Sequence, residues 1–139
     1  MAIEIEKLDY TPDDIGDLVG RAFEEYGEKN GIDCDYVSFC FVAKDGEKVL
    51  GVVQGHAYYN EVHVGDLIVM EDSRKSGIGT KLMLAVEEAF TGKGRININL
   101  TTYAFQAPEF YKKLGYEVEY VRKNPVEKLD KYFLIKRIG

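Results

Sequence analysis

Two glycines with one residue between them occupy a turn that could bind an anion. Gly77 and Gly79 follow a strand-like segment that ends at Val69, and an amphipathic segment starts directly after them. Glycine has no Cβ, so the backbone can turn tightly there and a ligand can approach it closely. The first amides of a helix lack acceptors within the helix, and the positive end of the helix dipole lies behind them. The turn therefore predicts a site for phosphate or a similar anion.

Charged residues beside the glycines add donors to this predicted site. Arg74 and Lys75 lie at its edge. The turn differs from the loop of nucleoside-triphosphate-binding proteins, because Lys81 follows Thr80 instead of preceding a hydroxyl residue. It also lacks the third glycine of the dinucleotide fingerprint. A structural interpretation stays open, in which the glycines only shape a turn from strand to helix. The candidate anion-binding residues are Arg74, Lys75, Ser76, Gly77, Ile78, Gly79 and Thr80.

Length and composition predict one globular domain over residues 1–139. Hydrophobic residues make up 45% of the chain and charged residues 30%, as in ordinary soluble proteins. The apolar runs are too short for a membrane span, and the N-terminus lacks the pattern of a signal peptide. We therefore expect a cytoplasmic protein without a membrane partner. The net charge of −6 argues against a nucleic-acid partner.

The two cysteines predict neither a metal site nor a disulfide framework. Cys34 and Cys40 have no histidine nearby at the spacing of metal ligands. Their expected role is that of small, buried apolar residues. We therefore expect no metal in this protein.

Hydrophobic periodicity predicts an α+β fold. Residues 2–8 alternate like a strand, and Thr11 is the expected N-cap of a helix with Pro12 at its first position. A stripe on that helix is expected to face the core: Ile15, Leu18, Val19, Ala22, Phe23 and Tyr26.

The rest of the chain predicts further strands and two more helices. Asp45 and Gly46 form the turn of an expected hairpin. A helix after the glycine turn carries an apolar stripe of Leu82, Met83, Val86, Ala89 and Phe90, and a short helix covers residues 108–114. Strands are expected at 38–44, 48–58, 62–69, 95–102, 116–122 and 131–138. Together these elements predict a mixed, mostly antiparallel sheet of six to seven strands with helices on both faces.

The glycine turn and its surroundings resemble the GNAT superfamily of N-acetyltransferases. The pattern Arg/Gln-x-x-Gly-x-Gly/Ala resembles the pyrophosphate loop of that family, and the preceding Leu-x-Val matches residues 67–69. The family's Phe-Tyr-x-x-x-Gly-Phe/Tyr matches residues 110–116, and Ala107 matches an alanine before it. The chain departs from many members at Ala104, where they have an asparagine that contacts the cofactor; Gln106 is the candidate substitute. The order of elements agrees along nearly the whole chain.

This resemblance implies an acetyl-CoA-dependent acyltransferase that acetylates a primary amine by direct attack. The expected acceptor is a small molecule. The backbone of Leu67, Ile68 and Val69 would pair with the pantetheine arm of acetyl-CoA, and Ile68 would donate to the oxyanion where the strand leaves its neighbour. Tyr111 would be the acid that protonates the leaving thiolate.

The general base has three candidates. His63 occupies the position where some family members carry a glutamate base, and it has the same strand parity as Leu67 and Val69. A free histidine titrates near neutral pH, which suits a base. Glu61 and His56 are alternatives, as is a base that acts through water.

One further strand carries a polar face independently of the resemblance. Asn97, Asn99 and Thr101 alternate with apolar residues in a strand that would be apolar throughout if both its faces were covered. This face could therefore meet a polar cleft that holds substrate or cofactor, or it could simply meet water.

Two other functions stay open, as does the identity of the acceptor. One is a regulatory module that binds CoA without turnover, and the other is a structural domain. Acceptor specificity is expected in residues 20–36 and 122–130, and homodimerisation is common in the family. Acidic residues in the first of these segments could attract a cationic amine: Glu24, Glu25, Glu28, Asp33 and Asp35.

Overall fold

The computed structural model describes residues 2–139 and divides into two compact units. The first ends at Cys34, and the second runs from Asp35 to Gly139. No helix within the described residues is long and apolar enough to cross a membrane.

The first unit contains one helix, α1 (Asp13–Asn30), which ends at Gly31 in the left-handed conformation. It begins one residue later than the sequence predicts, because Pro12 is the N-cap and Thr11 does not cap it. The predicted strand at residues 2–8 is wrong: this segment is exposed and unpaired. A strand needs a neighbour for its backbone groups, and this unit contains none.

The apolar stripe of α1 does not face a core in this unit. Phe23 is 58% exposed and Leu18 is 54% exposed, and no residue of α1 is buried. The periodicity predicted the helix correctly, and the core-facing role of its stripe stays a prediction. A single helix with no second layer has nothing within its own unit to pack against.

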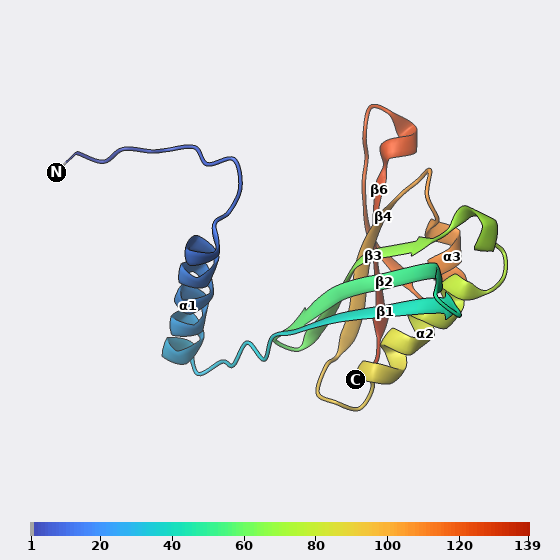
Figure 1. Cartoon of the computed structure of the whole chain (residues 1–139), viewed down its shortest axis with the longest axis horizontal. Coiled ribbons are helices and arrows are strands. Elements are labelled where there is room, and N and C mark those ends of the chain that lie inside the picture. Colours follow the sequence, from blue (N-terminus) through green and yellow to red (C-terminus); the bar gives the residue numbers. More distant parts are fainter. Residues whose placement is uncertain (1) are drawn as a thin grey trace. The chain divides into compact units, whose positions relative to one another are not determined.

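The second unit is built on a six-stranded mixed sheet, as the sequence predicts (Figure 1). The strand order is β1-β2-β3-β4-β6-β5, and only the β3–β4 pair is parallel. Mostly antiparallel pairing follows from the short connections between β1, β2 and β3 and from the return of β6 beside β4. The strands are β1 (Val37–Asp45), β2 (Lys48–Tyr58), β3 (Glu61–Val69), β4 (Asn97–Tyr103), β5 (Glu117–Arg122) and β6 (Lys131–Arg137).

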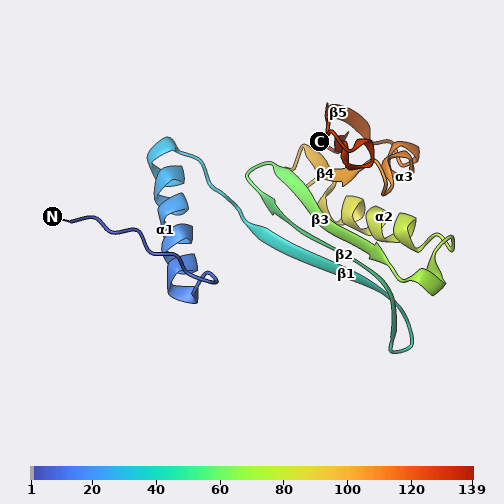
Figure 2. The same cartoon turned by 90° about the horizontal axis from the view of Figure 1, so that it is seen from above.

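Two helices and the sheet enclose the core of this unit (Figure 2). Helix α2 (Ile78–Phe90) buries most of the predicted stripe, with Met83 and Val86 fully inaccessible. Helix α3 (Pro108–Lys113) adds Tyr111 to the same cluster. Both helices of this unit therefore contribute to one core, and α1 belongs to the other unit.

The predicted burial of the cysteines is wrong. Cys34 is half-buried, and Cys40 is exposed on β1. Cys40 alternates with Phe39 and Phe41, which pack against the core, so its side chain points to the opposite face of the sheet.

Candidate active site

A fork between two parallel strands lies at the centre of the sheet. Strands β3 and β4 pair only from Glu61 opposite Asn97 to His63 opposite Asn99. Beyond that point they run apart, as Figure 1 shows. The end of β3, residues 67–69, keeps its pairing with β2, and no strand of the described residues lies on its other side. The sheet thus contains one internal strand edge that an extended ligand could pair with.

A β-bulge precedes this free edge. The β2–β3 register shifts where Gln54 pairs with Asp66 and Gly55 pairs with Val64, so Gly65 is the extra residue. An extra residue inverts the alternation of side chains beyond it. The predicted shared parity of His63 with Leu67 is therefore wrong in space: Leu67 packs against the core, whereas His63 lies between the buried Val62 and Val64 and points the other way.

The direction of the backbone on β3 distinguishes the candidate oxyanion donors. The amide of Met70 donates to the carbonyl of Leu50 on β2 at 2.9 Å. Successive residues of a strand point their backbone groups to opposite sides, so Ile68 also faces β2 while Leu67 and Val69 face the free edge. The structure therefore favours Leu67 over the predicted Ile68 as an amide donor at the fork.

The glycine turn leads from β3 into the N-terminus of α2. Gly77 is the N-cap, with φ 80°, a left-handed conformation that favours glycine. A Cβ added there would meet no atom within 4 Å, so the turn faces open space. The first bond of the helix runs from the Lys81 amide to the Gly77 carbonyl at 3.0 Å, which leaves the amides of residues 78–80 for a ligand.

The second glycine of the turn has a packing role. A Cβ added to Gly79 would lie 3.1 Å from Cζ of Phe110 on α3. Gly79 thus lets α3 approach the first turn of α2. This contact brings the Phe-Tyr segment of α3 beside the glycine turn.

Some side chains of the turn form hydrogen bonds within the protein, and others are exposed to solvent. Nε of Arg74 donates to the carbonyl of Val69 at 3.2 Å, which ties the turn to the end of β3. The hydroxyl of Ser76 donates to the carbonyl of Ser73. Lys75 is exposed and has φ 66°. The turn is therefore held in shape by its own hydrogen bonds, with cationic side chains at its surface.

Tyr111 is buried where α3 meets the core. Its side chain is 8% exposed, and its ring packs edge-on against Phe110 and Tyr116. Burial raises the pKa of Tyr111 to about 12, because the ionised phenolate would lose its hydration. The hydroxyl therefore keeps its proton throughout the neutral range.

A second buried tyrosine lies behind Tyr111. The hydroxyl of Tyr116 has no hydrogen-bond partner among the described residues. Burial raises its pKa, and the nearby Glu87 carboxylate and Tyr111 add to this effect. Glu87 forms an ion pair with Lys136, whose ammonium group also donates to the carbonyl of Leu114 at 2.7 Å. This group of polar side chains fastens α2 and α3 to β6.

Gln106 closes the turn between β4 and α3. Its side-chain oxygen accepts from the amide of Tyr103 at 3.1 Å and from the hydroxyl of Thr102 at 3.3 Å. Only its side-chain nitrogen is left to contact a ligand. The predicted substitution for the asparagine missing at Ala104 stays a prediction.

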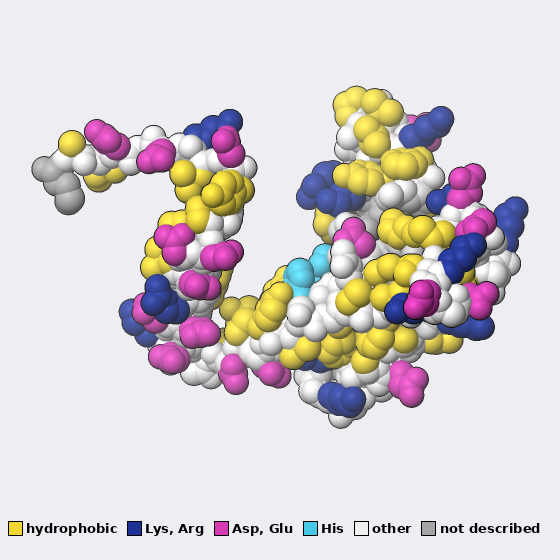
Figure 3. All heavy atoms as spheres, viewed as in Figure 1, with side chains coloured by type: hydrophobic (Ala, Val, Ile, Leu, Met, Phe, Trp, Pro, Cys, Tyr) yellow, Lys and Arg dark blue, Asp and Glu magenta, His cyan; other side chains and the backbone are white. Residues whose placement is uncertain are grey.

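The two histidines of the chain lie side by side on the face of the sheet opposite the core. His56 and His63 are partners in the β2–β3 register, with ring centroids 5.7 Å apart (Figure 3). Nδ1 of His63 lies 2.8 Å from Oδ1 of Asn99, across the last pair before the fork. His56 stacks against Tyr36 and against Tyr58. Of the two histidines, His63 is therefore the one at the vertex of the fork.

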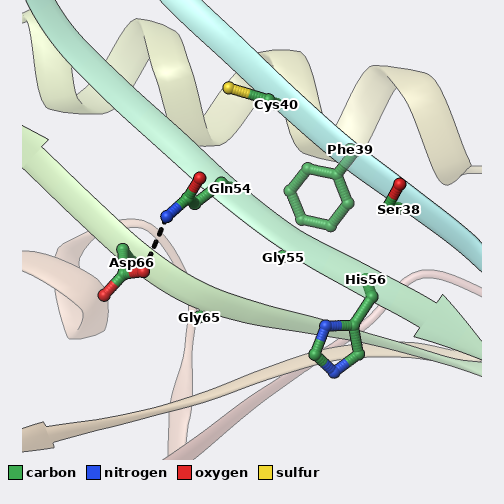
Figure 4. Close-up of a pocket in the computed structure, with 8 residues that line it drawn as sticks. All are labelled: Ser38, Phe39, Cys40, Gln54, Gly55, His56, Gly65 and Asp66. Atoms are coloured by element: carbon green, nitrogen blue, oxygen red, sulfur yellow. Dashed lines mark hydrogen bonds between the residues drawn. The ribbon is translucent and has the colours of Figure 1, made fainter. Parts of the chain in front are cut away.

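A cleft of about 440 Å³ opens beside the bulge (Figure 4). Asp66 and Gln54 lie at one end, where the Gln54 amide donates to the Asp66 carboxylate at 2.9 Å, and His56 lies at the other. Sequence reasoning missed Asp66 and Gln54 as site residues. Their signal is one polar residue on each strand, and the two are seen to be partners only in the register between β2 and β3. The cleft is lined by Ser38, Phe39, Cys40, Gln54, Gly55, His56, Gly65 and Asp66.

Solved structures with this fold include acetyltransferases. An acetyltransferase from Bacillus cereus ATCC 14579 is 28% identical with a TM-score of 0.77, covering 95% of this chain and 97% of that chain. An aminoglycoside 6'-acetyltransferase type Ii is 25% identical with a TM-score of 0.64, covering 92% of this chain and 82% of that chain.

Sequence comparison gives the same family. The chain is 36% identical over 74 residues to the blasticidin-S acetyltransferase of Streptomyces morookaense. That match covers 52% of this chain and spans about half of that relative, 54% of its length. The family described as acetyltransferase (GNAT) domain matches residues 37–118, which is more than half of the chain and includes the fork, the glycine turn and α3. The chain therefore belongs to the GNAT family of acetyltransferases.

Proposed function

We propose that this chain transfers an acetyl group from acetyl-CoA to a primary amine of a small molecule by direct attack. The observation that carries the proposal is the fork: a free edge of β3 runs directly into a turn with open helix N-terminal amides. The pantetheine arm of acetyl-CoA contains amides that can pair with a strand edge, and its pyrophosphate is an anion. The strand edge and the turn are adjacent in the structure, as the pantetheine arm and the pyrophosphate are adjacent in acetyl-CoA.

The residues present fit the two ends of this cosubstrate. The amides of Ile78, Gly79 and Thr80 would hold the pyrophosphate, with Lys75 and the outer nitrogens of Arg74 supplying charge. The backbone of residues 67–69 would hold the arm. The thioester would then lie toward the vertex of the fork, where His63 and Asn99 face each other.

His63 is proposed as the general base. An aliphatic amine is protonated at neutral pH and attacks a thioester only as the free amine. After attack, the nitrogen must lose another proton, and a neutral imidazole at the vertex can accept it. The Leu67 amide is the proposed donor to the oxyanion, because its backbone faces the free edge.

Tyr111 is proposed to stabilise the leaving thiolate by a hydrogen bond. A thiol such as that of CoA has a pKa of about 8.5, by analogy with cysteine. Burial raises the pKa of Tyr111 to about 12, so complete proton transfer from this hydroxyl to the thiolate is unfavourable. Tyr111 would instead donate a hydrogen bond to the developing negative charge on sulfur, which stabilises it less than complete proton transfer would.

The cleft beside the bulge is proposed to receive the acceptor. Its volume suits a small molecule, and the Asp66 carboxylate within it would attract an ammonium group. The names of two relatives, blasticidin-S acetyltransferase and aminoglycoside 6'-acetyltransferase, support a small-molecule acceptor. A single functional domain over residues 1–139, a cytoplasmic location and homodimerisation stay predictions.

Acetyl-CoA titration followed by a thiol-release assay tests the proposal. We expect calorimetry to detect binding of acetyl-CoA, and thiol release to accelerate with at least one member of a panel of small primary amines. Mass spectrometry of that amine should show one added acetyl group. Binding without amine-dependent thiol release would favour the regulatory module, and absence of binding would favour the structural domain.

A further inference from the structure

Four polar side chains form a continuous hydrogen-bonded chain across the parallel β3–β4 pair. Oε1 of Glu61 lies 3.0 Å from Nδ2 of Asn97, and Oδ1 of Asn97 lies 2.9 Å from Nδ2 of Asn99. Oδ1 of Asn99 lies 2.8 Å from Nδ1 of His63. We call this arrangement the Glu61–His63 chain. It joins two residues of one strand through two residues of its neighbour.

The carboxylate sets the direction of every bond in this chain. A carboxylate only accepts, so Asn97 must turn its amide nitrogen toward Glu61 and its oxygen toward Asn99. Asn99 then donates to that oxygen and presents its own oxygen to His63. Nδ1 of His63 must therefore carry a hydrogen, and in the neutral ring Nε2 holds the free electron pair.

Burial makes the reverse direction unfavourable. Asn97 is 3% exposed, so its amide has little access to water as a replacement partner. If the chain reversed, the Asn97 oxygen would face the Glu61 carboxylate, and two acceptors would lie in contact without a proton between them. The exposed carboxylate at one end thus determines the ring nitrogen that is available at the other.

We propose that Glu61, Asn97 and Asn99 are positioning residues that hold His63 as the Nδ1–H tautomer, with Nε2 available to take the proton from the acceptor amine. This inference rests on the proposed role of His63 as base. Transfer of a proton from the attacking nitrogen to Nε2 gives an imidazolium, which donates from both nitrogens. The Asn99 oxygen accepts from Nδ1 before and after that transfer, so no side chain has to turn.

Other titratable and charged groups surround His63. His56 faces it from β2, with Tyr36 and Tyr58 stacked on His56. On β6, Arg137 is the register partner of Asn97. None of these groups is joined to Nδ1 of His63 in the described structure, where Asn99 is the partner.

Substitutions of Glu61 test the inference, because they change the end of the chain without touching the histidine. Glu61→Asp keeps an acceptor and should keep the tautomer, with activity within about three-fold of the wild-type value. Glu61→Gln can accept or donate, so it should give a mixture of tautomers. Glu61→Lys can only donate, so it should reverse the chain and place the hydrogen on Nε2, with kcat lower by about ten-fold or more.

The tautomer is read directly by ¹⁵N NMR of the imidazole nitrogens in the full chain, at a pH at which the rings are neutral. The chain has two histidines, and a His56→Gln variant assigns their signals. Glu117→Lys is the matched control, because it places the same charge change at the exposed start of β5. It should change neither the His63 signals nor kcat.

The spectrum requires no substrate, which separates this inference from the proposed function. An Nε2–H tautomer in the wild-type protein, or an unchanged Nδ1–H tautomer in Glu61→Lys, would overturn the inference even if the enzyme turns over an amine. Conversely, absence of turnover with every amine would overturn the proposed function, and the spectra would still decide how the chain is directed. If the tautomer follows the series but kcat does not, the positioning role in catalysis is wrong.

Discussion

The two faces of the central strands carry opposite kinds of residue on the same backbone. One face of β3 and β4 presents Val62, Val64, Ile98 and Leu100, all nearly inaccessible to solvent. The other presents His63 and the amides of Asn97 and Asn99. The apolar face stabilises the sheet by packing against α2, and the polar face arranges hydrogen-bonding groups at the fork. Because successive side chains of a strand point to opposite faces, residues that stabilise the core and residues proposed to act in the reaction are neighbours in the sequence.

Substitution in the apolar face should give the largest loss of stability. Ile98 is 0% exposed, so Ile98→Ala leaves a cavity in the core and should lower the free energy of unfolding by about 2 to 5 kcal/mol. Urea denaturation followed by circular dichroism measures this loss. Ile96→Ala is the matched control, because Ile96 is 46% exposed, and it should cost clearly less. Equal losses would mean that burial of Ile98 in the core does not carry this stability.

Substitution in the polar face should lower activity and leave stability nearly unchanged. His63→Ala should lower kcat by about 100-fold or more at neutral pH, as expected for a lost general base, while the melting temperature changes little. Steady-state thiol release over a range of pH measures the effect. A His63→Ala enzyme with the full pH–rate profile of the wild type would remove His63 from the mechanism, and His56→Ala and Glu61→Ala would then test the alternatives.

Alkaline pH should lower the free energy of unfolding, because the core contains buried tyrosines. Tyr111 ionises at its ordinary pKa of 10.0 in the unfolded chain and at a pKa of about 12 in the folded one. The folded state therefore holds more protons between these values, and stability falls as pH rises from 10 to 12, by about 2 to 3 kcal/mol for this residue. Urea denaturation at pH 9 and pH 11 should show a smaller loss for Tyr111→Phe than for the wild type. An equal loss would show that Tyr111 does not drive this alkaline instability.

Tyr111 also tests the separation between the faces, because it lies in the core and is proposed to act in chemistry. Tyr111→Phe should lower kcat by about ten-fold, the size expected for one lost hydrogen bond to a charged group. Tyr116→Phe is its control in the same cluster and should leave kcat unchanged. If kcat does not change in Tyr111→Phe at any pH, the tyrosine is a core residue only, and the faces are separate without exception.

Local sequence patterns predicted most of the elements. The hairpin turn after Asp45, the stripe of α2 and the short helix that starts at Pro108 all lie where periodicity and turn residues indicate. These features depend on contacts within a few residues, so a sequence pattern suffices for them. The polar face of β4 was also visible as the alternation of Asn97, Asn99 and Thr101.

The predictions that failed depend on partners distant in sequence. Residues 2–8 have the alternation of a strand without a neighbour to pair with. The shared parity of His63 and Leu67 failed because Gly65 adds a residue to β3, and a bulge is visible only in the register with β2.

By itself, the sequence determined the helices and strands of residues 35–139, the glycine turn and the family. Their signals are local or lie in short motifs. Only the tertiary structure decided that β3 leaves β4 after His63, and that Glu61, Asn97, Asn99 and His63 form one hydrogen-bonded chain. His63 and Asn99 are 36 residues apart, and they meet only through the parallel register of β3 and β4. The spacing of residues within either strand does not predict that register.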